Sequence, residues 1–178
     1  MKLGIITGTT RKGNAGTAIG QWVHEALQGR TDVELAELSV ADFDLNFLTE
    51  ETIPGMANGV YEDEKTTAWA AAIKELDGFL FVTPEYNAAP PAAMKNAVDL
   101  LFAEWSEKPV GFVGYGFHKG VRAVNQWRDI VRNLKMVDAE TAVEIDLGAE
   151  MADGSFAPAE GQVEVLNKVV DEVLAAAK

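Results

Sequence analysis

Short apolar segments alternate with segments of helical periodicity along this chain, and the alternation constrains its fold more than any other feature. In the helical segments, apolar residues recur at three- and four-residue spacing. The apolar segments predict strands at residues 2–7, 33–38, 78–82, 110–113 and 141–145. Strands that are apolar throughout are typical of a parallel sheet covered by helices on both faces. The sequence therefore predicts an α/β fold.

The order of the strands follows from the handedness of their connections. Right-handed crossovers between parallel strands favour a doubly wound sheet. With five strands we expect a flavodoxin-like sheet of order 2-1-3-4-5, with helices on both faces, in a single domain over residues 1–178. Ligands of such sheets bind at the carboxyl edge, at the switch point between the first and third strands. The loops expected there are residues 8–16 and 83–90.

Two further expectations concern helices and a long loop. We expect a helix over residues 91–105 that begins with a proline, where a missing N–H does no harm. Residues 43–61 contain a proline and two glycines without clear periodicity, and we expect a long excursion over one rim of the sheet. The tryptophans are expected on helices, in core or subunit packing: Trp22, Trp69, Trp105 and Trp127.

Composition and charge exclude several classes of function. The absence of cysteine excludes disulfides and cysteine-ligated zinc or iron–sulfur centres. A formal net charge of −13 would repel nucleic acid. We expect no membrane partner and a cytoplasmic protein, because no apolar run approaches a membrane span and no basic-then-apolar leader precedes the first strand. Residues 32–64 hold ten acidic residues and no lysine or arginine, so Arg11 and Lys12 stand out as a local positive spot.

The first loop, residues 8–17, combines hydroxyls, glycines and an arginine ahead of a helix. Backbone N–H groups and the helix dipole favour a phosphate at such a helix start, where Arg11 would add a bidentate contact. The alternative is an ordinary capped turn with Asn14 as the N-cap. The loop lacks both the Lys-Ser/Thr pair of a P-loop and the Gly-x-Gly-x-x-Gly fingerprint of dinucleotide folds. A monophosphate is therefore the better-matched anion.

The loops after the third and fourth predicted strands are also unusual. In residues 83–87 a proline fixes the backbone, Tyr86 offers a ring face, and Asn87 offers a donor and an acceptor to a flat, polar-edged ring. Residues 114–120 hold three glycines that permit close approach of a ligand. The alternatives are an ordinary turn with a core tyrosine for the former and plain turn chemistry for the latter. Both interpretations stay open on the residues alone.

No catalytic or metal-ligating constellation is legible. The two histidines form no metal motif, since His24 falls on a predicted helix and His118 has no identifiable partner for a catalytic base. Glu85 and Asp99 are interpreted as structural or interface groups rather than a general acid–base pair. We therefore name no catalytic residue and no metal ligand.

The three loops together resemble those of the NADPH-dependent FMN reductase family, and the resemblance covers nearly the whole chain. Residues 8–11 are similar to its G-[ST]-x-R phosphate loop, residues 83–87 are identical to its T-P-E-Y-N signature, and residues 94–99 resemble the L-K-N-A-[IV]-D helix that follows. Residues 108–110 and 120–123 resemble its later strand and loop-to-helix segment.

The resemblance implies non-covalently bound FMN, with NADPH or NADH as co-substrate, in a homodimer or homotetramer often built through the helix after the signature. By position, the FMN phosphate would be held by Thr9, Arg11, Asn14, Gly16 and Thr17. The isoalloxazine would be lined, mainly by backbone groups, by Pro84, Glu85, Tyr86 and Asn87, and closed on its other side by Tyr115, Gly116 and Gly120.

Three departures from the family pattern affect the expected site. Asn14 and Gly16 stand where Ser and Asn are common, and Gly16 offers only its backbone. The pair at residues 88–89 is Ala-Ala rather than polar, which is expected to make the pocket beside the flavin more apolar. Residues 118–120 replace a glycine-rich turn, and Lys119 either meets the phosphates of the nicotinamide cofactor or is solvated.

The leading hypothesis is an NAD(P)H-dependent FMN oxidoreductase that passes a hydride from the nicotinamide to FMN and on to a quinone, flavin, azo compound or metal oxyanion. The alternative is a flavodoxin-type electron carrier, which binds FMN but oxidises NAD(P)H poorly and docks a basic partner on its acidic surface. A weaker alternative is a regulatory binding module that has lost flavin.

Overall fold

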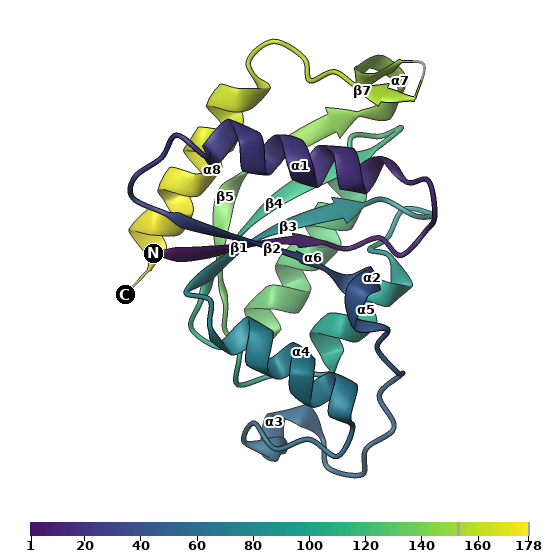
Figure 1. Ribbon diagram of the computed structural model, residues 1–178, viewed down its shortest axis with the longest axis vertical. Helices are drawn as coiled ribbons and strands as arrows, with labels where there is room; N and C mark the ends of the chain where they lie inside the picture. The colour runs from purple at the N-terminus through teal and green to yellow at the C-terminus, as the bar shows by residue number, and fades with distance from the viewer. Residues whose placement is uncertain (153, 178) are drawn as a thin grey trace.

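The computed structural model describes residues 1–152 and 154–177. Its main sheet has five parallel strands in the order β2-β1-β3-β4-β5 (Figure 1). These strands are β1 (Lys2–Thr7), β2 (Glu34–Ser39), β3 (Gly78–Pro84), β4 (Pro109–Gly116) and β5 (Val137–Asp146). The predicted fold class and strand order are confirmed.

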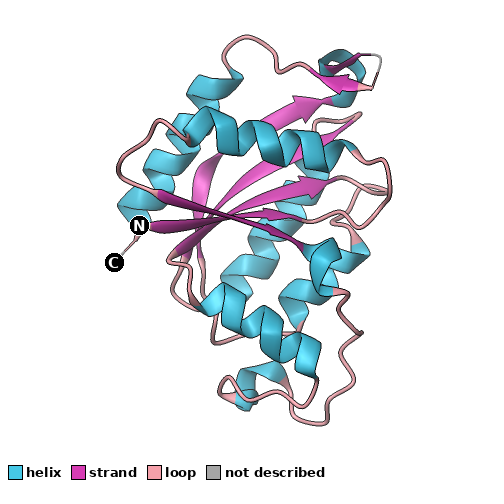
Figure 2. Cartoon of the chain, in the orientation of Figure 1, coloured by secondary structure: helices cyan, strands magenta, loops and turns pink. Residues whose placement is uncertain are grey.

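Helices cover both faces of the sheet (Figure 2). One face carries α1 (Ala15–Leu27) and α8 (Gln162–Ala176), and the other carries α4 (Glu64–Lys74), α5 (Ala92–Asp99) and α6 (Val121–Asn133). Short elements complete the chain: α2 (Val40–Phe43), α3 (Pro54–Ala57), α7 (Leu147–Glu150), and the antiparallel pair β6 (Met151–Ala152) and β7 (Ser155–Phe156). No helix in the described part of the chain has the length and apolar character needed to cross a membrane.

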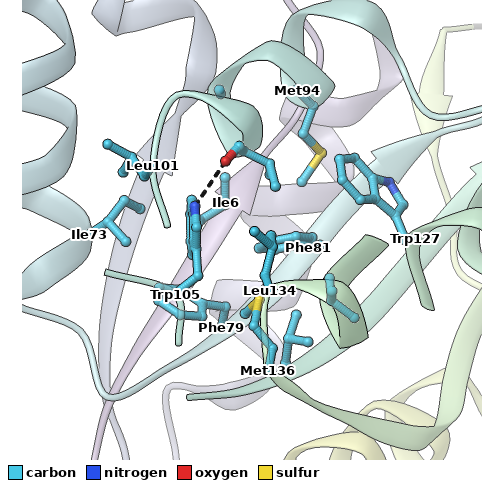
Figure 3. Packing of buried hydrophobic residues seen from close by; sticks show 14 of the residues in the cluster. Ile6, Ile73, Phe79, Phe81, Met94, Leu101, Trp105, Trp127, Leu134 and Met136 are labelled. Carbon is cyan, nitrogen blue, oxygen red and sulfur yellow. Dashed lines mark hydrogen bonds between the residues drawn. The ribbon is translucent and has the colours of Figure 1, made fainter. Parts of the chain in front are cut away.

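The central strand β3 and its neighbour β4 are buried along their whole length. Because side chains alternate across a strand, Phe79 and Phe81 point into the core under α4, α5 and α6, while Leu80 and Val82 point toward α1 and α8. Figure 3 shows the first of these cores, in which Trp105 packs edge-on against Phe79 with ring centroids 4.9 Å apart. The sheet is thus fixed by two separate apolar cores.

The expected helix over residues 91–105 is shorter than predicted. Helix α5 ends at Asp99, and residues 103–107 form turns, so Trp105 lies on no helix. The other three tryptophans lie on α1, α4 and α6, as predicted. The indole N–H of Trp105 donates to the Val98 carbonyl at 3.1 Å, drawn as the dashed line in Figure 3. Carbonyls of the last helical turn have no partner inside the helix, so this bond replaces the continuation that the apolar spacing suggested.

The chain also departs from expectation after β5. The strand is longer than predicted, and a segment containing α7, β6 and β7 follows it before α8. Glu150 holds this segment together, although it is a carboxylate with 4% of its surface exposed. It accepts hydrogen bonds from the Asp146 N–H at 2.9 Å and the Ala159 N–H at 2.8 Å. A buried acid that ties together residues 13 apart leaves no periodic signal in the sequence.

Asp138, near the start of β5, lies against two arginines of α6. Its side chain is 10% exposed and accepts hydrogen bonds from Arg128 Nη1 at 2.7 Å and Arg132 Nη2 at 2.9 Å. Burial by itself would raise the pKa of this carboxyl, but the hydrogen bonds from Arg132 and Arg128 together outweigh burial and lower it below its ordinary value. The ionised carboxylate therefore fastens the edge strand to α6.

We expect Asp138→Asn to lower the free energy of unfolding at pH 7 by about 1–2 kcal/mol, because charge-assisted hydrogen bonds are lost. The folded-state pKa lies below the unfolded value of about 3.9, so the carboxylate's contribution is present above that value. It is lost as the pH falls through the folded-state pKa. Urea unfolding of both proteins at pH 7 and near pH 3 measures the difference, and a difference that does not shrink at low pH contradicts the assignment.

Candidate functional site

Three loops meet at the carboxyl edge of the sheet, because β1, β3 and β4 are neighbours that point the same way (Figure 1). A cavity of ≈ 200 Å³ lies among these loops. It is lined by Arg11, Asn14, Ala15, Pro84, Glu85, Tyr86, Tyr115, Gly116, Phe117 and Leu147. The switch point of the sheet therefore gathers residues from all three loops that the sequence singled out.

The first loop is organised by Asn14, the N-cap of α1. Its side-chain oxygen accepts from the Thr17 N–H at 3.0 Å, and its amide nitrogen donates to the Arg11 carbonyl at 2.5 Å. The capped turn considered for this loop is thus present, and both ends of the Asn14 amide are used inside it. Arg11 itself is exposed at the cavity. The loop presents a helix start and a guanidinium together, the combination that binds anions.

A second cavity of ≈ 450 Å³ adjoins the first and shares Arg11 and Asn14 with it. Thr9 and Thr17 line this larger cavity, which extends from the first loop toward the carboxyl end of β2. It contacts neither the loop after β3 nor the loop after β4. The smaller cavity is therefore the one that joins the three loops.

Tyr115 rises from β4 to lie beneath the first loop. It is 3% exposed, and its hydroxyl has no hydrogen-bond partner of good geometry among the described residues, although Thr9 lies near it. A Cβ on Gly16 would lie 2.4 Å from that hydroxyl, so glycine is required there by close approach. Burial, with a further contribution from Tyr86, raises the pKa of Tyr115 above its ordinary value, which keeps the hydroxyl protonated. A buried, unpartnered donor at a helix start points to a ligand acceptor.

The signature loop, residues 84–89, is a tight hairpin. Tyr86 and Ala89 exchange backbone hydrogen bonds of 3.0 and 3.1 Å, and the residues between them, Asn87 and Ala88, have φ of 51° and 65°. Two left-handed residues at the tip match the twist of a two-residue hairpin, but Ala88 adopts this conformation at a cost that glycine would avoid. The loop is therefore a strained structure that its surroundings must hold.

Tyr86 links the signature loop to the first loop. Its hydroxyl is 2.8 Å from Oγ1 of Thr9, which is 2% exposed, whereas Tyr86 itself is 38% exposed. The alternative of a core tyrosine is therefore wrong, since the ring lies at the cavity wall. Asn87 is at the exposed tip of the same loop and does not line the cavity.

The third loop, residues 114–120, closes the cavity from β4. Gly120 has φ of 73°, and a Cβ there would lie 2.4 Å from the Tyr115 nitrogen, so this position requires glycine. Gly120 supports the loop without lining the cavity. Lys119, at φ of 59°, takes a left-handed conformation without being glycine. Phe117 is 79% exposed at the rim of the cavity.

Besides Ala15 of the first loop, three residues at this site were not singled out from the sequence. Phe117 belongs to a loop that was recognised, but no spacing marked its ring as a wall of the cavity. Leu147 reaches the cavity because β5 pairs with β4, where Ile145 lies opposite Tyr115. Arg122 of α6 pairs with Glu85, which agrees with a structural role for that carboxylate. No group of three or more histidines or carboxylates in residues 1–152 and 154–177 is arranged to hold a metal.

The sheet is doubly wound, and the cleft at its switch point lies between the first loop and the signature loop. These features define a flavodoxin-like protein. The model of the NADPH-dependent FMN reductase family matches residues 1–150. The chain belongs to this family, and it is an oxidoreductase.

Individual relatives agree with this assignment. The chain is 37% identical over 140 residues to an NAD(P)H-dependent FMN reductase of Schizosaccharomyces pombe, covering 79% of this chain and 70% of the relative. It is 33% identical over 185 residues to an NAD(P)H-dependent FMN reductase of Saccharomyces cerevisiae, covering 98% and 95%. FerB, a flavoenzyme NAD(P)H:(acceptor) oxidoreductase from Paracoccus denitrificans, superposes with a TM-score of 0.79 over 99% of both chains, and at 20% identity it shows the fold. The family prediction is confirmed, and the reductase is supported over the electron carrier.

Proposed function

We propose that this chain binds FMN in the switch-point cavity and transfers a hydride from NADPH or NADH to a small-molecule acceptor, such as a quinone, a free flavin, an azo compound or a metal oxyanion. Bound FMN supplies the hydride chemistry. The residues of the chain hold the phosphate, orient the ring and shape the space beside it. Membership of the FMN reductase family supports the reaction, and the unpartnered hydroxyl of Tyr115 is the observation that carries the binding site.

The phosphate end of the proposed site is the start of α1. The first N–H groups of a helix have no partner within it, and the cap of Asn14 uses that of Thr17. The N–H groups of Ala15 and Gly16 would then be available to the FMN phosphate. Arg11 would add its positive charge there. The resemblance placed Tyr115 beside the ring. We propose instead that its hydroxyl donates to the phosphate from below, through the space that the missing side chain of Gly16 leaves. Thr9 would act through its contact with Tyr86.

The ring end of the proposed site is the signature loop. Pro84, Glu85 and Tyr86 line the cavity on one side, and Gly116 lines it on the other. The Glu85 N–H already donates to the Tyr115 carbonyl at 2.9 Å, which ties the two sides together. No acidic or basic side chain is required for the hydride transfer, and we assign none.

The purified protein is expected to show the visible absorption of oxidised flavin, which bleaches rapidly when NADPH or NADH is added without air. Separate additions of the two nucleotides identify the preferred co-substrate. Flavin bands that persist with both nucleotides would favour an electron carrier. A protein that contains no flavin and binds no added FMN would overturn the proposal.

Tyr115→Phe is expected to weaken FMN binding about ten-fold, because a hydrogen bond to a charged group is lost. The unfolding free energy of the FMN-free protein should not fall, since the hydroxyl has no partner without ligand. Fluorescence titration with FMN and urea unfolding of the FMN-free protein measure the two effects.

Tyr61→Phe is the matched control. The Tyr61 hydroxyl donates to Glu104 Oε2 at 2.8 Å, and Glu104 is 7% exposed, so this change should destabilise the protein and leave FMN affinity intact. FMN affinity that is unchanged in Tyr115→Phe contradicts the assigned phosphate contact.

We also propose that the protein acts as a homodimer or homotetramer in the cytoplasm, where NAD(P)H is available. Large apolar side chains exposed on the excursion before α4 support self-association: Phe47 (76% exposed), Ile53 (61%), Met56 (69%) and Val60 (76%). Sedimentation equilibrium is expected to find an oligomer for the wild-type protein and a monomer for Met56→Asp. A monomeric wild-type protein contradicts the proposed assembly, and cell fractionation tests the location.

A further inference from the structure

Helix α6 holds the strained signature loop from behind, through side chains of its first two turns. The Gln126 amide donates to the Ala88 carbonyl at 2.5 Å, which fixes a residue in left-handed conformation. The Trp127 indole N–H donates to Thr83 Oγ1 at 2.9 Å, at the point where β3 leads into the loop. The geometry of the loop is therefore set by α6 as well as by its own sequence.

The strongest of these contacts joins Arg122 to Glu85. The side chain of Glu85 is 3% exposed, and its Oε1 accepts from Arg122 Nε at 2.6 Å while its Oε2 accepts from the Arg122 backbone N–H at 3.0 Å. Arg122 Nη2 also forms an ion pair with Oε1. Arg122 is the one cation paired with Glu85 among the described residues, and its own side chain is 48% exposed. A buried carboxylate is costly unless it is paired in this way.

Glu85 lies at the cavity as well as at the helix. It is a lining residue, and its Cβ would be 3.3 Å from a Cβ placed on Gly116 across the cavity wall. Its Cβ therefore borders the space in which the flavin ring would lie, and its carboxylate is buried behind that wall against Arg122. Arg122 determines whether the negative charge behind the cavity wall is compensated or uncompensated.

We propose that Arg122 is a positioning residue of the flavin site, which neutralises Glu85, holds the signature loop against α6 and thereby sets the midpoint potential of bound FMN. This inference rests on the proposed function. Reduction adds electrons to the flavin, so an uncompensated carboxylate beside it disfavours the reduced form. A unit charge about 10 Å away, at an effective dielectric constant of about 20, changes such an equilibrium about ten-fold. A ten-fold change corresponds to about 30 mV for a two-electron couple.

The test is a redox titration of the FMN-loaded protein. Arg122→Ala is expected to lower the two-electron midpoint potential by about 30 mV, and Arg122→Lys, which keeps the charge, should retain most of the wild-type value. The double variant Glu85→Gln/Arg122→Ala should return close to the wild-type potential, because both charges of the pair are then absent. Glu85→Gln alone should raise it.

Arg132→Ala is the matched control, because Arg132 also lies on α6 and pairs with a largely buried carboxylate, Asp138, away from the signature loop. This variant should leave the midpoint potential at the wild-type value. A second measurement needs no FMN. The unfolding free energies of the FMN-free wild type, Glu85→Gln, Arg122→Ala and the double variant form a double-mutant cycle, which should reveal coupling between the two residues.

Three results would overturn the inference. They are a potential of Arg122→Ala equal to that of Arg132→Ala, a double variant whose potential stays as low as that of Arg122→Ala, and an unchanged potential in Glu85→Gln. If Arg122→Ala does not fold, Arg122→Lys and Glu85→Gln still decide the question. A wild-type protein that binds no FMN would instead refute the proposed function, so the two failures are distinguishable.

Discussion

Parallel pairing of three buried strands is the constraint on which the candidate site depends. In the register of the sheet, Thr7 of β1 lies opposite Val82 of β3, and Pro84 of β3 lies opposite Tyr115 of β4. The three carboxyl ends are therefore nearly level, and the loops that follow them are within hydrogen-bonding reach of one another. The Thr9–Tyr86 contact and the bond from the Glu85 N–H to the Tyr115 carbonyl are consequences of this register. The apolar cores on both faces keep the edge rigid.

The edge is crowded, and small residues make the close contacts possible. A Cβ on Gly8 would lie 2.9 Å from Cγ and 3.0 Å from Cβ of Met94, so a larger residue there would force Met94 of α5 to shift. Gly16 and Gly120 are required in the same way around Tyr115. Where the chain uses Ala88 and Lys119 at positive φ, backbone strain is retained at the site and is balanced by contacts from outside the loops.

The candidate site is not strongly negative, although the chain as a whole is, because cations offset the negative charge locally. The protein carries a net charge of −13, yet the cavity contains Arg11 in the first loop and a Glu85 neutralised by Arg122. Tyr115 adds a donor that stays neutral, because its environment raises its pKa. An anionic cofactor in this cleft would therefore meet two kinds of donor, a cation and a neutral hydroxyl, together with the helix start. Overall charge governs which macromolecules approach, whereas these few groups govern what the cleft holds.

The sequence by itself determined the α/β class, the strand order, the family and the loops that form the cleft. Periodicity and short motifs are local, and handed crossovers leave few ways to connect the strands. It did not reveal the end of α5, because Trp105 bonds back to Val98 in a contact that has the same apolar spacing as a helix. The tertiary structure alone decided that Glu85 pairs with Arg122, 37 residues away, and that the Tyr115 hydroxyl, under Gly16, has no partner of good geometry in residues 1–152 and 154–177. Such pairings depend on strand register and helix packing, which bring together residues that no spacing along the chain relates.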